Sequence, residues 1–112
     1  MIEKSGFNEI IGTEAPDELL GENSNNTLGH DTLTGTSGDD LIDGKSGNDT
    51  IKGLAGNDVL IGGSGHDTIK GGSGNDAIYG DSGDDTISTG EGNDSVWGGS
   101  GDDTITLSLI HI

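Results

Sequence analysis

Aspartate recurs every nine residues along most of this sequence, and carboxylate oxygens are ligands that hard cations such as Ca²⁺ prefer. Nine consecutive nine-residue units run without interruption from Asn26 to Thr106. Position six of every unit is an aspartate: Asp31, Asp40, Asp49, Asp58, Asp67, Asp76, Asp85, Asp94 and Asp103. A fixed period indicates a repeated structure in which each copy has the same surroundings. These aspartates are therefore our candidate metal ligands.

Position four of the unit is always glycine. After Gly29 in the first unit, the glycines that we add to the candidate metal site are Gly38, Gly47, Gly56, Gly65, Gly74, Gly83, Gly92 and Gly101. Glycine adopts positive φ and allows backbones to approach closely, so positions one to six predict a tight turn. Ca²⁺ takes six to eight oxygens, more than two aspartates supply, so we expect backbone carbonyl groups of these turns to complete each site.

Position eight of the unit is always aliphatic: Leu33, Ile42, Ile51, Leu60, Ile69, Ile78, Ile87, Val96 and Ile105. Its two neighbours are mostly polar, so positions seven to nine predict a short strand whose middle residue points inward. Such a short strand must stack on copies of itself, which is how solenoids bury a continuous core. The repeats therefore predict an all-β solenoid.

Several units resemble a known family. The segments Gly62-Gly63-Ser64-Gly65-His66-Asp67, Gly71-Gly72-Ser73-Gly74-Asn75-Asp76 and Gly98-Gly99-Ser100-Gly101-Asp102-Asp103 are similar to the turn of the RTX (repeats-in-toxin), hemolysin-type calcium-binding nonapeptide repeat. The resemblance implies a parallel β-roll, which is a right-handed solenoid with two units per 18-residue coil. It also implies Ca²⁺ between turns stacked on one edge, and a bacterial parent protein secreted by type I export.

An 18-residue coil places alternate aspartates on opposite edges. One edge carries Asp31, Asp49, Asp67, Asp85 and Asp103, and the other carries Asp40, Asp58, Asp76 and Asp94. One ion between each vertically adjacent pair gives about seven Ca²⁺ in all. The first unit starts with Asn26-Thr27 in place of two glycines, so we expect the site between Asp31 and Asp49 to be the weakest.

The charge of the chain points to the same ligand. Its 112 residues include 21 Asp and Glu against 4 Lys and Arg, a net charge of -17, and only 27% of them are hydrophobic. Such a chain is expected to be disordered by itself, and it repels nucleic acid and anionic membranes. Seven Ca²⁺ would reduce the charge to about -3, so we expect a disordered chain without calcium and a folded one with it.

The two ends depart from the repeat. We expect residues 1–25 to form degenerate repeats that cap the N-terminal end, with Ile10 and Leu19 in the place of position eight. A short helix over residues 17–21 is an alternative. We expect residues 107–112 to form a C-terminal capping strand. Six residues are few for an export signal, so we expect a fragment of a larger protein, or a short protein that is not exported by itself.

The outward positions seven and nine differ between the two predicted sheets. One sheet has a threonine column, which offers an adhesion or ice-binding surface as an alternative function: Thr32, Thr50, Thr68, Thr86 and Thr104. Threonine is also a common exposed strand residue. The other sheet has apolar residues that could dock a neighbouring domain or a second copy: Leu41, Val59, Ile61, Tyr79 and Trp97.

We find no catalytic motif in the sequence. The chain has no cysteine, and its histidines, His30, His66 and His111, are expected to be exposed. No apolar stretch is long enough to span a membrane. We therefore expect a secreted, non-enzymatic calcium-binding module that supports the secretion, folding or stability of a larger toxin, protease or adhesin. The non-catalytic repeat part of a secreted enzyme is an alternative.

Overall fold

The last three residues of each repeat form a β-strand, as the residue pattern predicts. The computed structural model describes residues 3–4, 9–11, 18–20 and 30–107. The strands of the repeats are β4 (Thr32–Thr34), β5 (Leu41–Asp43), β6 (Thr50–Lys52), β7 (Val59–Ser64), β8 (Thr68–Lys70), β9 (Ala77–Ser82), β10 (Thr86–Ser88), β11 (Ser95–Trp97) and β12 (Thr104–Thr106). β7 and β9 are longer than expected, because their pairing continues into the turn with Gly63 opposite Asp81 and Ser64 opposite Ser82.

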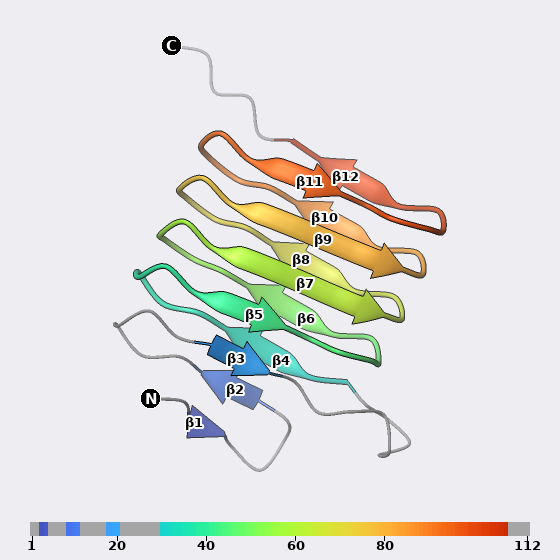
Figure 1. The fold of residues 1–112 in the computed structure, drawn as a ribbon, viewed down its shortest axis with the longest axis horizontal. Helices are drawn as coiled ribbons and strands as arrows, with labels where there is room; N and C mark the ends of the chain where they lie inside the picture. The colour runs from blue at the N-terminus through green and yellow to red at the C-terminus, as the bar shows by residue number, and fades with distance from the viewer. Residues whose placement is uncertain (1–2, 5–8, 12–17, 21–29, 108–112) are drawn as a thin grey trace.

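The strands form two parallel sheets that are the two broad faces of a solenoid (Figure 1). Every pairing between repeats joins residues 18 positions apart, such as Thr50 with Thr68 and Leu60 with Ile78. One coil therefore consists of two repeats. In Figure 1 the front strands run from left to right, the rear strands return, and the chain rises toward its C-terminus, which is a right-handed winding. The predicted parallel β-roll is confirmed.

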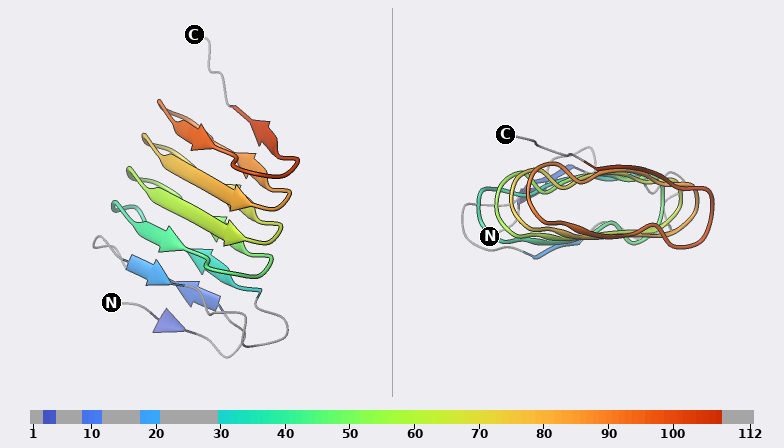
Figure 2. Two further views of the ribbon diagram at one scale, coloured as in Figure 1. Left: turned by 45° about the vertical axis from the view of Figure 1, so that its right-hand side comes forward. Right: turned by 90° about the horizontal axis from the view of Figure 1, so that it is seen from above.

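The core consists of inward-facing side chains from both sheets. The residues at position eight are fully buried: Leu33, Ile42, Ile51, Leu60, Ile69, Ile78 and Ile87. Seen along the stack, the coils superimpose as a flattened ring (Figure 2), and the seven residues form one hydrophobic cluster. Val96, in β11, is only partly buried, and Ile105, in β12, is 42% exposed. In the described part of the chain, β11 and β12 are the last strands of their sheets.

Strands before residue 26 continue both sheets. β2 (Glu9–Ile11) pairs in parallel with β4, and β3 (Glu18–Leu20) pairs in parallel with β5. Ile10 lies opposite Leu33 and Leu19 lies opposite Ile42, so both stand in the place predicted for position eight. The alternative of a helix is wrong for Glu18–Leu20.

The sheet that contains β2 ends in an antiparallel strand. β1 (Glu3–Lys4) pairs with β2 in the opposite direction, which the repeat pattern does not predict. That 1–25 caps the solenoid stays a prediction, as does the capping strand at 107–112, most of which lies outside the described residues. In the described ranges, no helix is long and apolar enough to cross a membrane.

Candidate metal centre

The aspartates at position six form a ladder along each edge of the solenoid. The backbone N–H of Asp49 donates to Oδ1 of Asp67 in the next coil, at 2.9 Å, and that of Asp58 donates to Oδ1 of Asp76, also at 2.9 Å. The same bond joins Asp31 to Asp49, Asp67 to Asp85, Asp85 to Asp103, Asp40 to Asp58 and Asp76 to Asp94, all at 2.8–2.9 Å. The structure thus places the aspartates on the two edges that the 18-residue spacing predicts.

The second carboxylate oxygen of most ladder aspartates has no hydrogen-bond donor. Oδ2 is buried and accepts no hydrogen bond in six of them: Asp49, Asp58, Asp67, Asp76, Asp85 and Asp94. A buried carboxylate oxygen without a partner costs free energy, because it has lost water and gained nothing in return. A positive charge beside these six atoms would offset that cost, and the described protein groups do not supply one.

The pKa values of the ladder aspartates show the same deficit of positive charge. Burial raises the pKa of Asp49 and of Asp58 to about 7, and raises the pKa of Asp67 and of Asp76 to about 6. Burial also raises the pKa of Asp85. The N–H donor opposes each shift and the neighbouring carboxylates add to it. A fully ionised ladder at neutral pH therefore needs a cation.

Backbone carbonyl groups converge on the same aspartates. A Cβ atom on Gly44, at position one, would lie 2.5 Å from Oδ2 of Asp49 and 2.7 Å from the carbonyl oxygen of Gly62 in the next coil. At position four, a Cβ on Gly65, whose φ is +119°, would collide with the carbonyl oxygen of Gly47 in the coil before it. The glycine columns thus leave room for carbonyl oxygens beside each ladder.

This set of donors suits a hard cation. In the described part of the chain, no group of three or more His, Cys, Asp and Glu side chains gathers at one point. Two aspartates and several carbonyl groups are then the available ligands, and Ca²⁺ prefers such an all-oxygen set, whereas Zn²⁺ prefers nitrogen and sulfur. The residues present therefore fit Ca²⁺. The ligand roles of the aspartates and of the position-four glycines stay a prediction.

The turn before Asp40 differs from the turns above it. Lys45, Leu54 and Asp81 stand at position two with φ of 76°, 72° and 74°, whereas Thr36, at the same position, is not among the positive-φ residues. A β-branched residue strongly disfavours positive φ. The N–H of Thr36 instead donates to Oδ2 of Asp40 at 2.8 Å. The sequence predicts that the weakest calcium site lies between Asp31 and Asp49, because the first unit departs most from the repeat. Residues 26–29 of that unit lie outside the described residues, so this stays a prediction.

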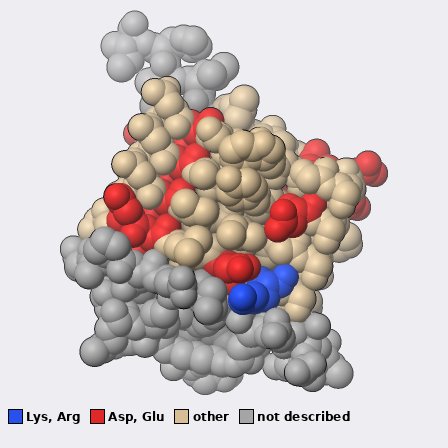
Figure 3. Space-filling model, viewed as in Figure 1, with Lys and Arg blue, Asp and Glu red and all other residues tan. Residues whose placement is uncertain are grey.

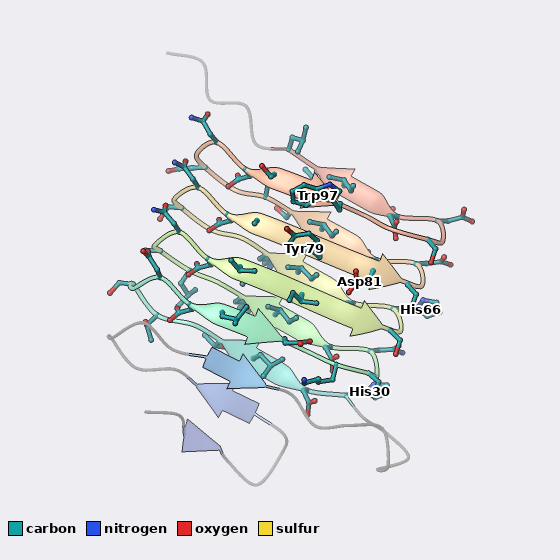
Figure 4. All side chains as sticks on the ribbon, in the orientation of Figure 1. His30, His66, Tyr79, Asp81 and Trp97 are labelled. Carbon is teal, nitrogen blue, oxygen red and sulfur yellow. The ribbon has the colours of Figure 1, made fainter. Side chains whose placement is uncertain are left out.

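The side chains at position five form a second ladder, which the sequence analysis missed. Nδ1 of His66 accepts the backbone N–H of Asp84 at 2.9 Å, and Oδ1 of Asn75 accepts that of Asn93 at 2.9 Å. Equivalent bonds join Asn48 to His30, His66 to Asn48, Asp102 to Asp84, Asn57 to Asp39 and Asn75 to Asn57. The sequence does contain a pattern that predicts this ladder. Every unit has His, Asp or Asn at position five, and each of these side chains has a hydrogen-bond acceptor two bonds beyond Cβ. His30 and His66 are exposed, as expected (Figure 4).

The outer surfaces of the two sheets differ as predicted. The threonine column is in register, with Thr86 opposite both Thr68 and Thr104. On the other sheet, the rings of Tyr79 and Trp97 stack with their centroids 4.6 Å apart and their planes 5° from parallel (Figure 4). Leu41 lies opposite Val59, and Ile61 lies opposite Tyr79. Acidic side chains gather mainly toward the edges of this face (Figure 3).

Comparison with known proteins gave one kind of match. The model of the RTX calcium-binding nonapeptide repeat matches four times, over residues 27–60, 43–78, 52–87 and 79–108. These matches together cover well over half of the chain. Comparison with curated proteins and with solved structures gave no match.

Proposed function

Since this chain belongs to the RTX calcium-binding nonapeptide repeat family, we propose that it folds around Ca²⁺ held by its two aspartate ladders. Each ion would be held by two ladder aspartates of adjacent coils, such as Asp49 and Asp67, together with glycine carbonyl groups such as that of Gly47. When bound, the ion would neutralise the buried carboxylates and join one coil to the next. Up to about seven such sites fit the ladder pairs.

One observation carries the proposal: six buried Oδ2 atoms without a hydrogen-bond donor in the described part of the chain. Arginine or lysine side chains would be expected beside these atoms if the ladder were neutralised by the protein itself. The chain has only four Lys and Arg in total against 21 Asp and Glu. An external cation is the simpler source of charge, and calcium fits the oxygen donors.

We further propose that binding and folding are one process. The core consists of one aliphatic residue per repeat, which is a small apolar area to offset the conformational entropy of the chain. Calcium sites do not exist in the unfolded chain, so their binding free energy stabilises the fold. Sites with dissociation constants of roughly 0.1–1 mM would be empty inside a cell and filled outside it.

The role in a parent protein follows from this coupling. RTX repeats are typical of secreted bacterial proteins, and the repeat module itself is non-catalytic. We propose that the module supports the secretion, folding or stability of a larger secreted toxin, protease or adhesin, including a secreted enzyme whose active site lies elsewhere. The threonine column is not proposed as an ice-binding surface. The exposed Lys52 and Lys70 lie in the same strands as Thr50 and Thr68, two residues along from them.

A calcium titration followed by far-ultraviolet circular dichroism tests this function. We expect an unfolded spectrum in excess chelator, a β-rich spectrum in millimolar Ca²⁺, and little response to the same concentration of Mg²⁺. Magnesium is the matched control because it demands octahedral geometry and retains its waters. Isothermal titration calorimetry then counts the ions. A chain that is β-rich in chelator, or that ignores calcium, would contradict the proposal.

A further inference from the structure

The two ladders on each edge run in opposite directions. At position six, the N–H of Asp76 donates forward, to Asp94 in the next coil, at 2.8 Å. At position five, the N–H of Asn75 donates backward, to Oδ1 of Asn57 in the previous coil, also at 2.8 Å. Two successive N–H groups of one turn are thus held in opposite directions by side chains of different coils.

The bond at position five also sets the direction of a carbonyl group. The N–H of Asn75 and the C=O of Gly74 belong to one peptide group, and every described peptide bond is trans. In a trans peptide these two groups point to opposite sides. Because the N–H of Asn75 points backward, the carbonyl oxygen of Gly74 points forward, and a Cβ on Gly92 in the next coil would collide with it.

The forward gap is also where the next ladder aspartate lies. The carboxylate of Asp94 is in this gap, since its Oδ1 accepts the N–H of Asp76 there and its Oδ2 has no donor. In the described turns, no backbone hydrogen bond ends on the carbonyl oxygen of Gly74. A carbonyl oxygen and a carboxylate oxygen, both without donors, therefore lie in the gap between the same two coils.

We infer that the side chains at position five are positioning residues for the calcium sites: each holds the following coil's glycine carbonyl in the direction that a bound ion needs. The inference rests on the proposed function, because it assumes that the carbonyl groups at position four bind the ion. It explains why position five varies among His, Asp and Asn in charge and size, yet always has an acceptor two bonds beyond Cβ.

Variants of Asn57 test the inference, because its Oδ1 holds the N–H of Asn75 and thereby the carbonyl of Gly74. Asn57→Leu keeps the shape of the side chain and removes the acceptor. Asn57→Gln keeps the amide and moves the acceptor one bond outward. Asn57→His is the matched control, because His30 and His66 fill the same position and accept the same bond through Nδ1.

The measurement is calcium release from chains first shown to be folded in excess Ca²⁺ by circular dichroism. Stopped-flow mixing with a fluorescent chelator gives the release rate. Losing one hydrogen bond predicts a release of about one ion that is roughly two- to tenfold faster in the Leu and Gln variants. The His variant is expected to release calcium at the rate of the unmodified chain. The Gln variant, which stays polar at this exposed position, carries the test if the Leu variant does not fold.

The outcomes separate positioning from simple stability. If the Leu and Gln variants melt at lower temperature but release calcium at the unmodified rate, the position-five side chains only support the fold and the inference is overturned. Faster release from the His variant, equal to that from the Leu variant, also overturns it. Either result leaves the proposed function intact, whereas an unmodified chain that takes up no calcium overturns both.

Discussion

Replacing Asp67 by asparagine separates the two interactions of a ladder aspartate. Oδ1 of Asp67 accepts the N–H of Asp49 at 2.9 Å, and an asparagine Oδ1 can accept the same bond. The replacement removes the negative charge and the buried Oδ2 that has no donor. Asp67→Asn therefore keeps the hydrogen-bonded ladder and loses the proposed ligand.

The size of the effect follows from the place of Asp67 in the ladder. Asp67 lies between Asp49 and Asp85, so two proposed sites depend on it. For a dissociation constant of about 1 mM, each site stabilises the fold by about 1.4 kcal/mol at about 10 mM free Ca²⁺. Loss of both sites would cost about 3 kcal/mol. Asp103, the last aspartate of the same edge, takes part in one pair, so Asp103→Asn is the control and would cost about half as much.

The sign is expected to reverse without calcium. Burial raises the pKa of Asp67 to about 6, so at about pH 7.5 its buried charge destabilises the metal-free fold. Asparagine removes that charge. In a trimethylamine N-oxide titration of the calcium-free chain, which favours compact states, Asp67→Asn should fold at a lower osmolyte concentration than the unmodified chain.

Three measurements test these expectations. Urea denaturation gives the stability in calcium, the osmolyte titration gives the stability without calcium, and calorimetry counts the bound ions. We expect Asp67→Asn to lose two ions and Asp103→Asn one. The reasoning is refuted if Asp67→Asn destabilises the chain equally with and without calcium, or if the two variants lose the same number of ions.

Three further predictions concern pH and the turns. The pKa values of the Asp49 and Asp58 carboxyls are about 7 in the fold, against an ordinary 3.8. The calcium-free fold should therefore be most stable below about pH 4 and should lose stability as the pH rises to about 7. Circular dichroism in osmolyte would detect this loss. Leu54→Gly relieves a positive φ of 72° and should raise the melting temperature in calcium by a few degrees, a gain of about 0.5–1 kcal/mol, whereas Leu54→Val should lower it. Thr36→Gly permits the positive φ that Lys45 and Leu54 have at this position. The backbone N–H of residue 36 should then turn away from Oδ2 of Asp40 and one calcium site should be added or strengthened in calorimetry, which Thr36→Val, with its β-branch intact, should not do.

The period of the sequence predicts most of the fold. Because each repeat has one inward aliphatic residue, the nine-residue spacing predicts the strands. The resemblance to the RTX repeat implies the 18-residue coil, which predicts which of the strands pair. The same pattern, weaker in residues 3–20, places Ile10 and Leu19 opposite Leu33 and Ile42. It does not predict the antiparallel β1, since an antiparallel edge strand has no counterpart in the repeat.

The candidate site was less predictable, because its geometry depends on the directions of backbone groups. The aspartate column identifies one set of ligands from the sequence alone. The ladder at position five is harder to predict, because His66, Asn75 and Asp84 differ in charge and size. They share only the place of one hydrogen-bond acceptor atom. The altered turn at Thr36 likewise depends on φ, which residue type restricts without fixing.

The stacked pair on the outer face gives the molecule an optical property of its own. Trp97 is the only tryptophan and Tyr79 the only tyrosine in the chain, and their rings belong to adjacent coils. Parallel rings 4.6 Å apart couple electronically, and they meet only when β11 has docked on β9. The near-ultraviolet dichroism and fluorescence of the unlabelled chain should therefore report when its last full coil closes, independently of the far-ultraviolet signal from the rest of the sheets.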